Sequence, residues 1–137
     1  MGADLKAQAG EGSQGMRRIV LEGSAQDMGR CHGETYRDEI RDYAEDRVAL
    51  SSSGSWSGRA ADREEVIELA ASMLPAHRAY SEDLFSEMEA MAEACDLTPA
   101  EAIIVGGFTD FVDAVRATGA GVPDEDDCTA VVVPDSM

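Results

Sequence analysis

The segment Thr98-Pro99-Ala100-Glu101 is the clearest helix start in the chain. A threonine N-cap, a proline in the first turn and a glutamate three residues after the cap together satisfy the free amide groups of a helix start. The helix that begins here is predicted to run towards Ala117, and Gly106-Gly107 is predicted to weaken it. Its apolar side chains recur at helical spacing, which predicts a buried face made of Ile104, Phe108, Phe111, Val112 and Val115.

Three further segments carry helix signals, so we expect a chain that is mostly α-helical. Ser24-Ala25-Gln26-Asp27 has the form of a capping box, and the helix after it is predicted to run to about Leu50. A second helix is predicted to begin at Asp62, with Pro75 ending or kinking it. A third is predicted to open at Ser81 and to present Leu84, Phe85, Met88, Met91, Ala92 and Cys95 at helical spacing.

Two glycines four residues apart, Gly29 and Gly33, lie within the first predicted helix. Glycine lowers helix propensity, so we expect another backbone to pack closely against that side. His32 has two interpretations: a catalytic base beside Cys31, or a histidine satisfied within a core, which we favour because it lies on an apolar face. That face comprises Met28, His32, Tyr36, Ile40 and Tyr43.

The remaining segments of the first half of the chain show no helical period. Residues 1–15 are rich in Gly, Ala, Gln and Glu and are predicted to form a disordered leader. Arg18–Glu22 is predicted to be a short strand, and Ser51–Arg59 a loop. Trp56 in that loop has two interpretations, an anchor for a partner or a ring that folds back over its own core.

The chain is strongly acidic, with 28 acidic and 11 basic residues in 137 and a formal net charge of −17. Nucleic acids and anionic membranes bind clustered Lys and Arg, so we expect neither as a partner. No cationic start precedes an apolar run, and no apolar stretch approaches a membrane span, so a signal peptide and a membrane helix are not expected.

The three cysteines lie far apart, at Cys31, Cys95 and Cys128. Their spacing matches no zinc site, haem attachment motif or disulfide framework, so we expect no metal or other cofactor. Free thiols at this spacing favour a reducing cytoplasm.

Cys128 follows four consecutive acids, Asp124–Asp127, and precedes the β-branched run Thr129–Val133. If the peptide bond between Asp127 and Cys128 is cut, the thiol belongs to a new amino terminus whose α-amine, with a pKa of roughly 8, can act as its base. A buried structural cysteine is the alternative. The acidic run has two interpretations, a divalent-metal site or a solvated cleavage loop. The run lacks the glycine and the distal glutamate of a calcium-binding loop, so we favour the cleavage loop.

Three pieces of the chain, in order, resemble the acyl-coenzyme A:isopenicillin N acyltransferase family of self-cleaving N-terminal-nucleophile enzymes. The first is Arg18–Gly23 followed by Met28–Gly33, and the next two are Phe85–Ala92 and Leu97–Ile104. The pair Cys128-Thr129 then falls where the self-cleaving Cys-Thr of that family lies. Asp127 stands where the family pattern has glycine, and its neighbouring carboxylates raise the pKa of a thiol, which would slow the cleavage.

The resemblance implies an α+β protein, a four-layer αββα sandwich of which this fragment is the mostly helical leading part. Residues 16–127 would form the leading α fragment, and residues 128–137 the first strand of the catalytic β fragment. The partner would be the downstream catalytic fragment of the same precursor. Near the acyl-binding side of the family cleft, the resemblance implies substrate-binding roles for Thr109, Asp110 and Phe111.

The implied function is a precursor of an N-terminal-cysteine amidohydrolase or acyltransferase. Cys128 would act on a small amide or acyl-thioester substrate through a thioester acyl-enzyme. The alternative is a non-catalytic, acidic helical binding module in which Cys128 is structural.

Overall fold

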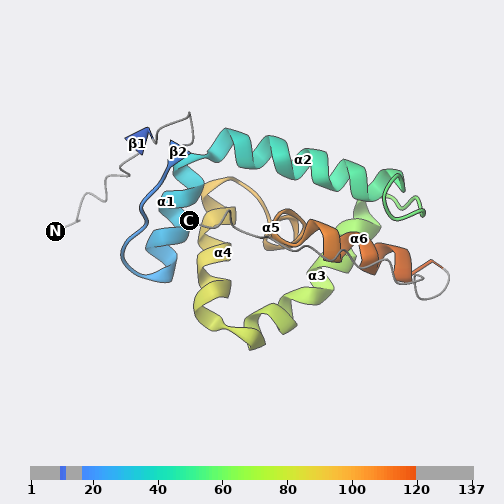
Figure 1. Cartoon of the computed structure of the whole chain (residues 1–137). Helices are drawn as coiled ribbons and strands as arrows, with labels where there is room; N and C mark the ends of the chain where they lie inside the picture. The colour runs from blue at the N-terminus through green and yellow to red at the C-terminus, as the bar shows by residue number, and fades with distance from the viewer. Residues whose placement is uncertain (1–9, 12–16, 120–137) are drawn as a thin grey trace, which may run out of the picture.

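The computed structural model describes residues 10–11 and 17–119, and these residues form six helices and one short antiparallel ladder. Strand β1 (Gly10–Glu11) pairs with strand β2 (Arg17–Arg18). The prediction of a mostly helical chain is therefore confirmed for this part of the chain. The helices are α1 (Ala25–Thr35), α2 (Arg37–Ser53), α3 (Arg63–Tyr80), α4 (Glu82–Ala94), α5 (Pro99–Gly106) and α6 (Phe108–Ala117) (Figure 1).

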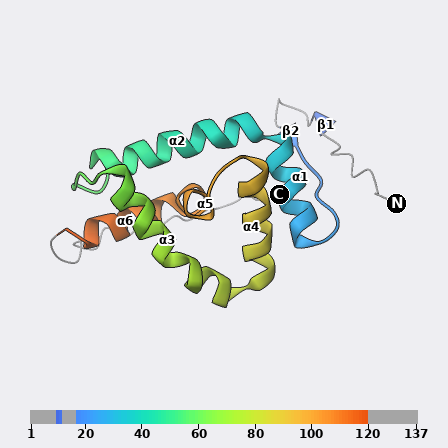
Figure 2. The ribbon, with the colours of Figure 1, turned by 180° about the vertical axis from the view of Figure 1, so that it is seen from behind.

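Helices α2, α3 and α4 lie around the pair α5 and α6. In Figure 1, α2 runs along the top, α3 and α4 meet at the bottom, and α5 and α6 lie between α2 and α3. The reverse view in Figure 2 shows the same order, with α1 beside α4 at the opposite end from α6. Burial of the apolar face of α5 and α6 against α2 and α3 makes the main core. Its buried residues are Val48, Val66, Ala70, Ala100, Ile103, Ile104, Phe108, Phe111, Val112 and Val115.

Every predicted helix start is confirmed. Ser24 and Thr98 each form a complete capping box, in which the N-cap hydroxyl accepts from the N3 amide and the N3 carboxylate accepts from the N-cap amide. Asp62 and Ser81 also accept a hydrogen bond from the backbone of the first turn that follows them. All five residues of the predicted buried face between Thr98 and Ala117 are buried.

Two of the predicted helices are interrupted. The helix predicted from Ala25 to Leu50 breaks at Tyr36, whose φ of −120° and ψ of 28° are not helical, and α2 then continues to Ser53. The helix predicted to reach Ala117 breaks at Gly107, where the glycine pair was predicted to weaken it, and ends at Ala117 as predicted. These breaks let α1 and α2, and α5 and α6, take different directions.

Pro75 does not end its helix, because α3 runs through it to Tyr80. A proline inside a helix leaves the carbonyl four residues earlier without its amide partner. That carbonyl belongs to Ala71, which is exposed, so water can hydrate it. Of the two predicted outcomes at Pro75, an end or a kink of the helix, the end is therefore wrong.

The short strand also differs from its prediction. Among the described residues, the ladder includes only Arg17–Arg18 with Gly10–Glu11, whereas a strand was predicted over Arg18–Glu22. The predicted leader contributes β1 at Gly10–Glu11, and its other residues lie outside the described part. Ile19 and Leu21 are half-buried. Their apolar alternation therefore reflects packing rather than a strand ladder.

The close packing predicted for Gly29 and Gly33 is confirmed, because α1 lies directly on α4. A Cβ built at Gly29 would overlap the carbonyl oxygen of Glu87 and lie 2.8 Å from its carbonyl carbon. One built at Gly33 would lie 2.7 Å from the Cβ of Ala94. The absence of a side chain at both positions lets the two backbones touch.

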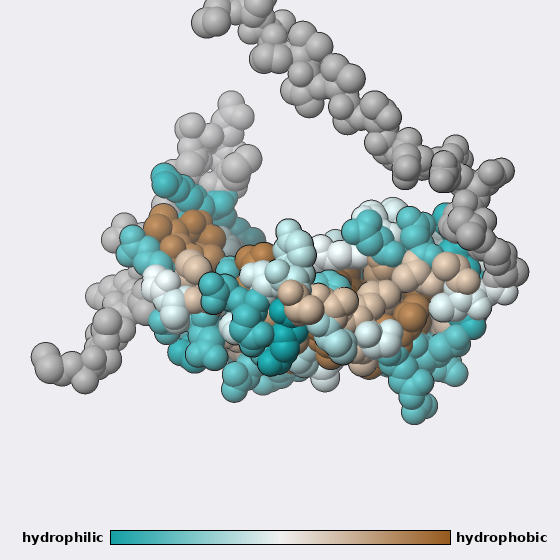
Figure 3. All heavy atoms as spheres, turned by 90° about the horizontal axis from the view of Figure 1, so that it is seen from below, coloured by the Kyte–Doolittle hydropathy of each residue, from teal (hydrophilic) through white to brown (hydrophobic). Residues whose placement is uncertain are grey.

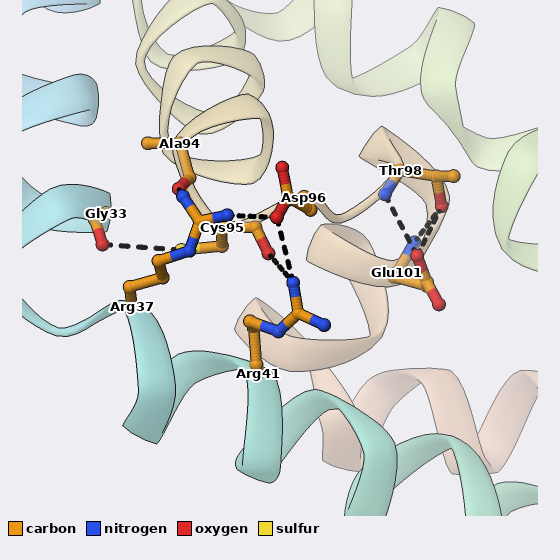
Figure 4. A network of polar contacts seen from close by, with 8 residues as sticks. All are labelled: Gly33, Arg37, Arg41, Ala94, Cys95, Asp96, Thr98 and Glu101. Atoms are coloured by element: carbon orange, nitrogen blue, oxygen red, sulfur yellow. Dashed lines mark hydrogen bonds and ion pairs between the residues drawn. The ribbon is translucent and has the colours of Figure 1, made fainter.

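Two arginines of α2 hold the end of α4 (Figure 4). The chain leaves α4 through Asp96, whose φ of 54° is left-handed, and the Leu97 amide then donates to the Ala92 carbonyl at 2.9 Å. Arg37 and Arg41 both pair with the Asp96 carboxylate, the second at 3.0 Å. These contacts connect the packed pair α1 and α4 to α2.

The surface carries much of the charge of the chain. Seen from below in Figure 3, teal charged and polar residues surround smaller, separate groups of brown apolar residues. Among the described residues, no helix has the length and the apolar character needed to cross a bilayer.

Candidate functional site

A hollow of about 610 Å³ opens beside the junction of α5 and α6. Gly106 and Gly107 form part of its wall, so the interruption of the helix exposes backbone there without a side chain to cover it. The remaining lining is mainly apolar and comes from α4 and α5, with contributions from α1, α3 and α6. These other lining residues are His32, His77, Leu84, Glu87, Met88, Met91, Ala102, Ile103, Val105 and Asp110.

Four ionisable side chains line this apolar hollow: His32, His77, Glu87 and Asp110. Nδ1 of His77 lies 3.0 Å from the carbonyl oxygen of Met73, which can only accept, so this nitrogen carries the proton. The other ring nitrogen of a neutral His77 is then an acceptor. An apolar wall with a few polar groups suits a small molecule that has an aliphatic part and a polar part.

A second hollow, of about 500 Å³, shares His32 and Val105 with the first. It lies against the first half of α2 and is lined there by Glu39, Ile40 and Tyr43, with the N-cap residue Tyr36 and Arg17 also in the lining. The hydrogen bond from Arg17 lowers the pKa of the Glu39 carboxyl. The two hollows are neighbours, since His32 and Val105 line both.

The three predicted substrate-binding residues occupy different environments. Asp110 is exposed and lines the 610 Å³ hollow. Thr109 is exposed on α6 and is not among the residues that line this hollow. Phe111 is only 2% exposed and packs within the core. The structure therefore brings Asp110 alone of the three to the hollow.

The predicted cleavage site, Asp127 and Cys128, lies outside the described residues. The other two cysteines differ in burial: Cys95 is fully buried, whereas Cys31 is half-buried. The Cys95 thiol donates to the Gly33 carbonyl at 3.5 Å, and burial raises the pKa of this thiol. Cys95 is therefore a structural cysteine that packs α4 against α1.

His32 is only half-buried, and its ring meets that of Tyr36 edge-on at 5.9 Å between centroids. It lines both hollows, so the favoured interpretation as a histidine satisfied within a core does not describe it. Neighbouring residues on a helix point about 100° apart, so His32 does not face the thiol of Cys31 as a base would have to.

The burial of Cys95 predicts a large difference in thiol reactivity. In a Cys128→Ala chain, we expect a thiol reagent to modify Cys31 at least about a hundredfold faster than Cys95, because the thiolate reacts and burial disfavours it. Mass spectrometry of the peptides over time measures both rates. Denaturant should make the two rates similar, and equal rates in the folded chain would contradict the buried position of Cys95.

Sequence reasoning did not identify His77 or Glu87 as lining residues. His77 was hidden because Pro75 was predicted to end or kink the helix before it. Leu84 and Met88 were predicted to lie on one stripe at helical spacing; Leu84 is 58% exposed, and Met88 is half-buried and lines the hollow. A stripe that exceeds what one neighbouring helix can cover is the signal that would have suggested an open apolar wall.

The described residues contain no group of three or more His, Cys, Asp or Glu side chains arranged to hold a metal ion. The acidic run Asp124–Asp127 lies outside them. Comparisons of the chain with protein-family models, with curated proteins and with solved structures found no match.

Proposed function

We propose that this chain is the leading part of a self-cleaving precursor whose Cys128 becomes the amino-terminal nucleophile of an amidohydrolase or acyltransferase. The observation that supports the proposal most directly is the apolar hollow of about 610 Å³ beside Gly106 and Gly107, which Asp110 lines. The resemblance implies an acyl-binding role for this same segment. The enzyme is proposed to be cytoplasmic.

In the proposed fold, the helices α1–α6 belong to the outer layers of a four-layer αββα sandwich. Thr129–Val133 supplies its first catalytic strand, and the downstream fragment of the same precursor supplies the rest. After cleavage the two fragments remain together as a heterodimer. The downstream fragment also provides the oxyanion donors and the groups that orient the new α-amine.

Cleavage of the precursor takes place in two steps. The Cys128 thiol attacks the carbonyl carbon of Asp127. The C–N bond breaks, the nitrogen takes the thiol proton, and a thioester between Asp127 and the Cys128 sulfur forms. Water then hydrolyses this thioester, which gives Asp127 a carboxylate and frees the Cys128 thiol. The carboxylates of Asp124–Asp127 slow the first step because they disfavour the thiolate, unless the loop points these side chains away from the thiol and towards solvent.

In the mature enzyme, the α-amine of Cys128 takes the proton of its own thiol, and the thiolate attacks a substrate amide or thioester. The leaving amine or thiol takes the proton, and the acyl group stays on sulfur. Transfer to water makes the enzyme a hydrolase, and transfer to an amine makes it an acyltransferase. Within the hollow, Leu84, Met88 and Ile103 contact the aliphatic part of the acyl group, and Asp110 binds its polar end.

Acyl-enzyme formation tests the proposal. The full precursor, expressed with its downstream sequence, is mixed with p-nitrophenyl esters of straight-chain acids. We expect a burst of about one equivalent of p-nitrophenol per active site, and an acyl group on Cys128 in the peptide masses. Cys31→Ala should leave the burst unchanged, whereas Cys128→Ala should remove it.

A chain that shows no burst and no acylated Cys128, while it binds another macromolecule, would instead be the acidic helical binding module. That module is the competing function, and the same experiment distinguishes the two.

A further inference from the structure

We propose that Thr129–Val133 docks lengthwise on one stripe of α2, where it covers the second hollow, of about 500 Å³. The stripe comprises Tyr36, Ile40, Tyr43 and Arg47, and it is called the α2 stripe below. The occupant is thus a segment of this same chain, outside the described residues, that carries three consecutive valines.

The α2 stripe is apolar, aromatic and incompletely covered. Ile40, Tyr43 and Arg47 recur every three or four positions, so they lie on one side of α2, and Tyr36 is the N-cap residue that precedes it. Ile40 and Tyr36 are half-buried, and Tyr43 is 43% exposed. The Arg47 guanidinium stacks over the Tyr43 ring at 4.6 Å and over the Phe108 ring at 4.8 Å. The aromatic rings and the stacked guanidinium give a partly apolar surface against which a β-branched strand can pack.

The chain leaves α6 beside the carboxyl end of α2, from which Thr129–Val133 could run back along that helix. Arg116, in the last turn of α6, donates to the Trp56 carbonyl at 2.9 Å, just beyond the end of α2 at Ser53. A Cβ built at Gly119 would overlap the side chain of Arg59, which belongs to the same loop. The last described residue therefore lies beside the carboxyl end of α2.

The lengths agree with this path. Along α2, the distance from Ser53 back to Tyr43 is about 15 Å, and to Tyr36 about 26 Å, at about 1.5 Å per residue. The residues from Gly119 to Thr129 can span up to about 33 Å when extended. A strand formed by Thr129–Val133 is about 16 Å long, which equals the length of the α2 stripe at those rises.

The charges also agree. The acids Asp124–Asp127 would pass the carboxyl end of α2, where Arg47, Arg59 and Arg116 lie. Each of these arginines pairs with one carboxylate already, and a guanidinium has N–H donors for a second. Trp56, which is 54% exposed and meets the Phe108 ring edge-on at 5.5 Å, would then border the path of the segment.

This inference does not depend on the proposed chemistry, because an uncut chain can dock in the same way. The test therefore uses Cys128→Ala, which cannot be cleaved by the proposed route. Success here with no cleavage of the natural precursor would leave the docking valid and the enzyme proposal refuted.

Paired cysteines test the position directly. In a Cys31→Ser, Cys128→Ala chain, Val132→Cys is combined with Tyr43→Cys, or with Tyr80→Cys as the matched control. Tyr80 is 85% exposed at the end of α3. With copper–phenanthroline as the oxidant, we expect the Tyr43 pair to form an intramolecular disulfide at least about tenfold faster, because a disulfide needs Cα atoms within about 7 Å.

Amide hydrogen exchange tests the same contact without new cysteines. Replacing Val131, Val132 and Val133 by serine should speed exchange in Tyr36–Arg47 at least about fivefold and leave α4 unchanged. Equal disulfide rates for the two pairs, or unchanged exchange in the serine variant, would overturn the proposal. Protection of the α2 stripe that rises with protein concentration would also overturn it, since a second copy would then be the occupant.

Discussion

Replacing Gly29 by alanine is expected to lower the free energy of unfolding by at least about 3 kcal/mol, or to separate α1 from α4 altogether. The new Cβ would overlap the Glu87 carbonyl oxygen, which belongs to the backbone of α4 and cannot turn away as a side chain can. Relief requires the two helices to move apart, and this movement would also strain the Cys95 thiol contact with Gly33. Urea unfolding followed by circular dichroism measures the loss.

Gly106→Ala is the matched control, because no atom lies within 4 Å of a Cβ built at that position. Alanine has the higher helix propensity, so the expected change is a stabilisation of up to about 1 kcal/mol. If Gly29→Ala and Gly106→Ala changed stability equally, the close approach of α1 to α4 would be refuted.

Replacing Phe111 by alanine is expected to cost about 3–5 kcal/mol, because its side chain is 2% exposed and lies among the core residues of α2, α3, α5 and α6. Thr109→Ala, on the exposed face of the same helix, should change stability by less than about 0.5 kcal/mol. Thermal and urea unfolding of the two variants measure this difference.

A Phe111→Ala variant of unchanged stability would contradict the core assignment and would return Phe111 to the substrate-binding role implied by the resemblance. The expected result instead leaves Asp110 as the residue of that trio that can contact a ligand in the hollow.

Local signals in the sequence identified where helices begin. The capping residues accept hydrogen bonds from amides in the next turn, so a few neighbouring residues in the sequence are sufficient to predict each helix start. They are Ser24, Asp62, Ser81 and Thr98. The close approach at Gly29 was also predictable, because a glycine pair in a helix needs a reason in packing.

Interruptions inside helices were harder to locate. Tyr36 breaks the first helix although no proline or glycine stands there, since α1 packs on α4 while α2 packs on α5. Pro75 remains inside α3, where the carbonyl that it leaves free belongs to the exposed residue Ala71. Both outcomes depend on tertiary neighbours and solvent, which propensity alone does not contain.

The candidate site was partly predictable for the same reason. Gly106, Gly107 and Asp110 are close in sequence, and the predicted weak point marked them together. His77 and Leu84 reach the hollow from α3 and α4, far away along the chain, and only the packing of those helices places them there. Cys128, on which the proposed chemistry depends, comes from the sequence alone.

The intact mass of the full precursor, measured beside that of its Cys128→Ala variant, tests the central claim most directly. The account predicts two fragments from the unaltered protein, with the boundary between Asp127 and Cys128, and one uncut chain from the variant. A single uncut chain from both proteins would contradict it.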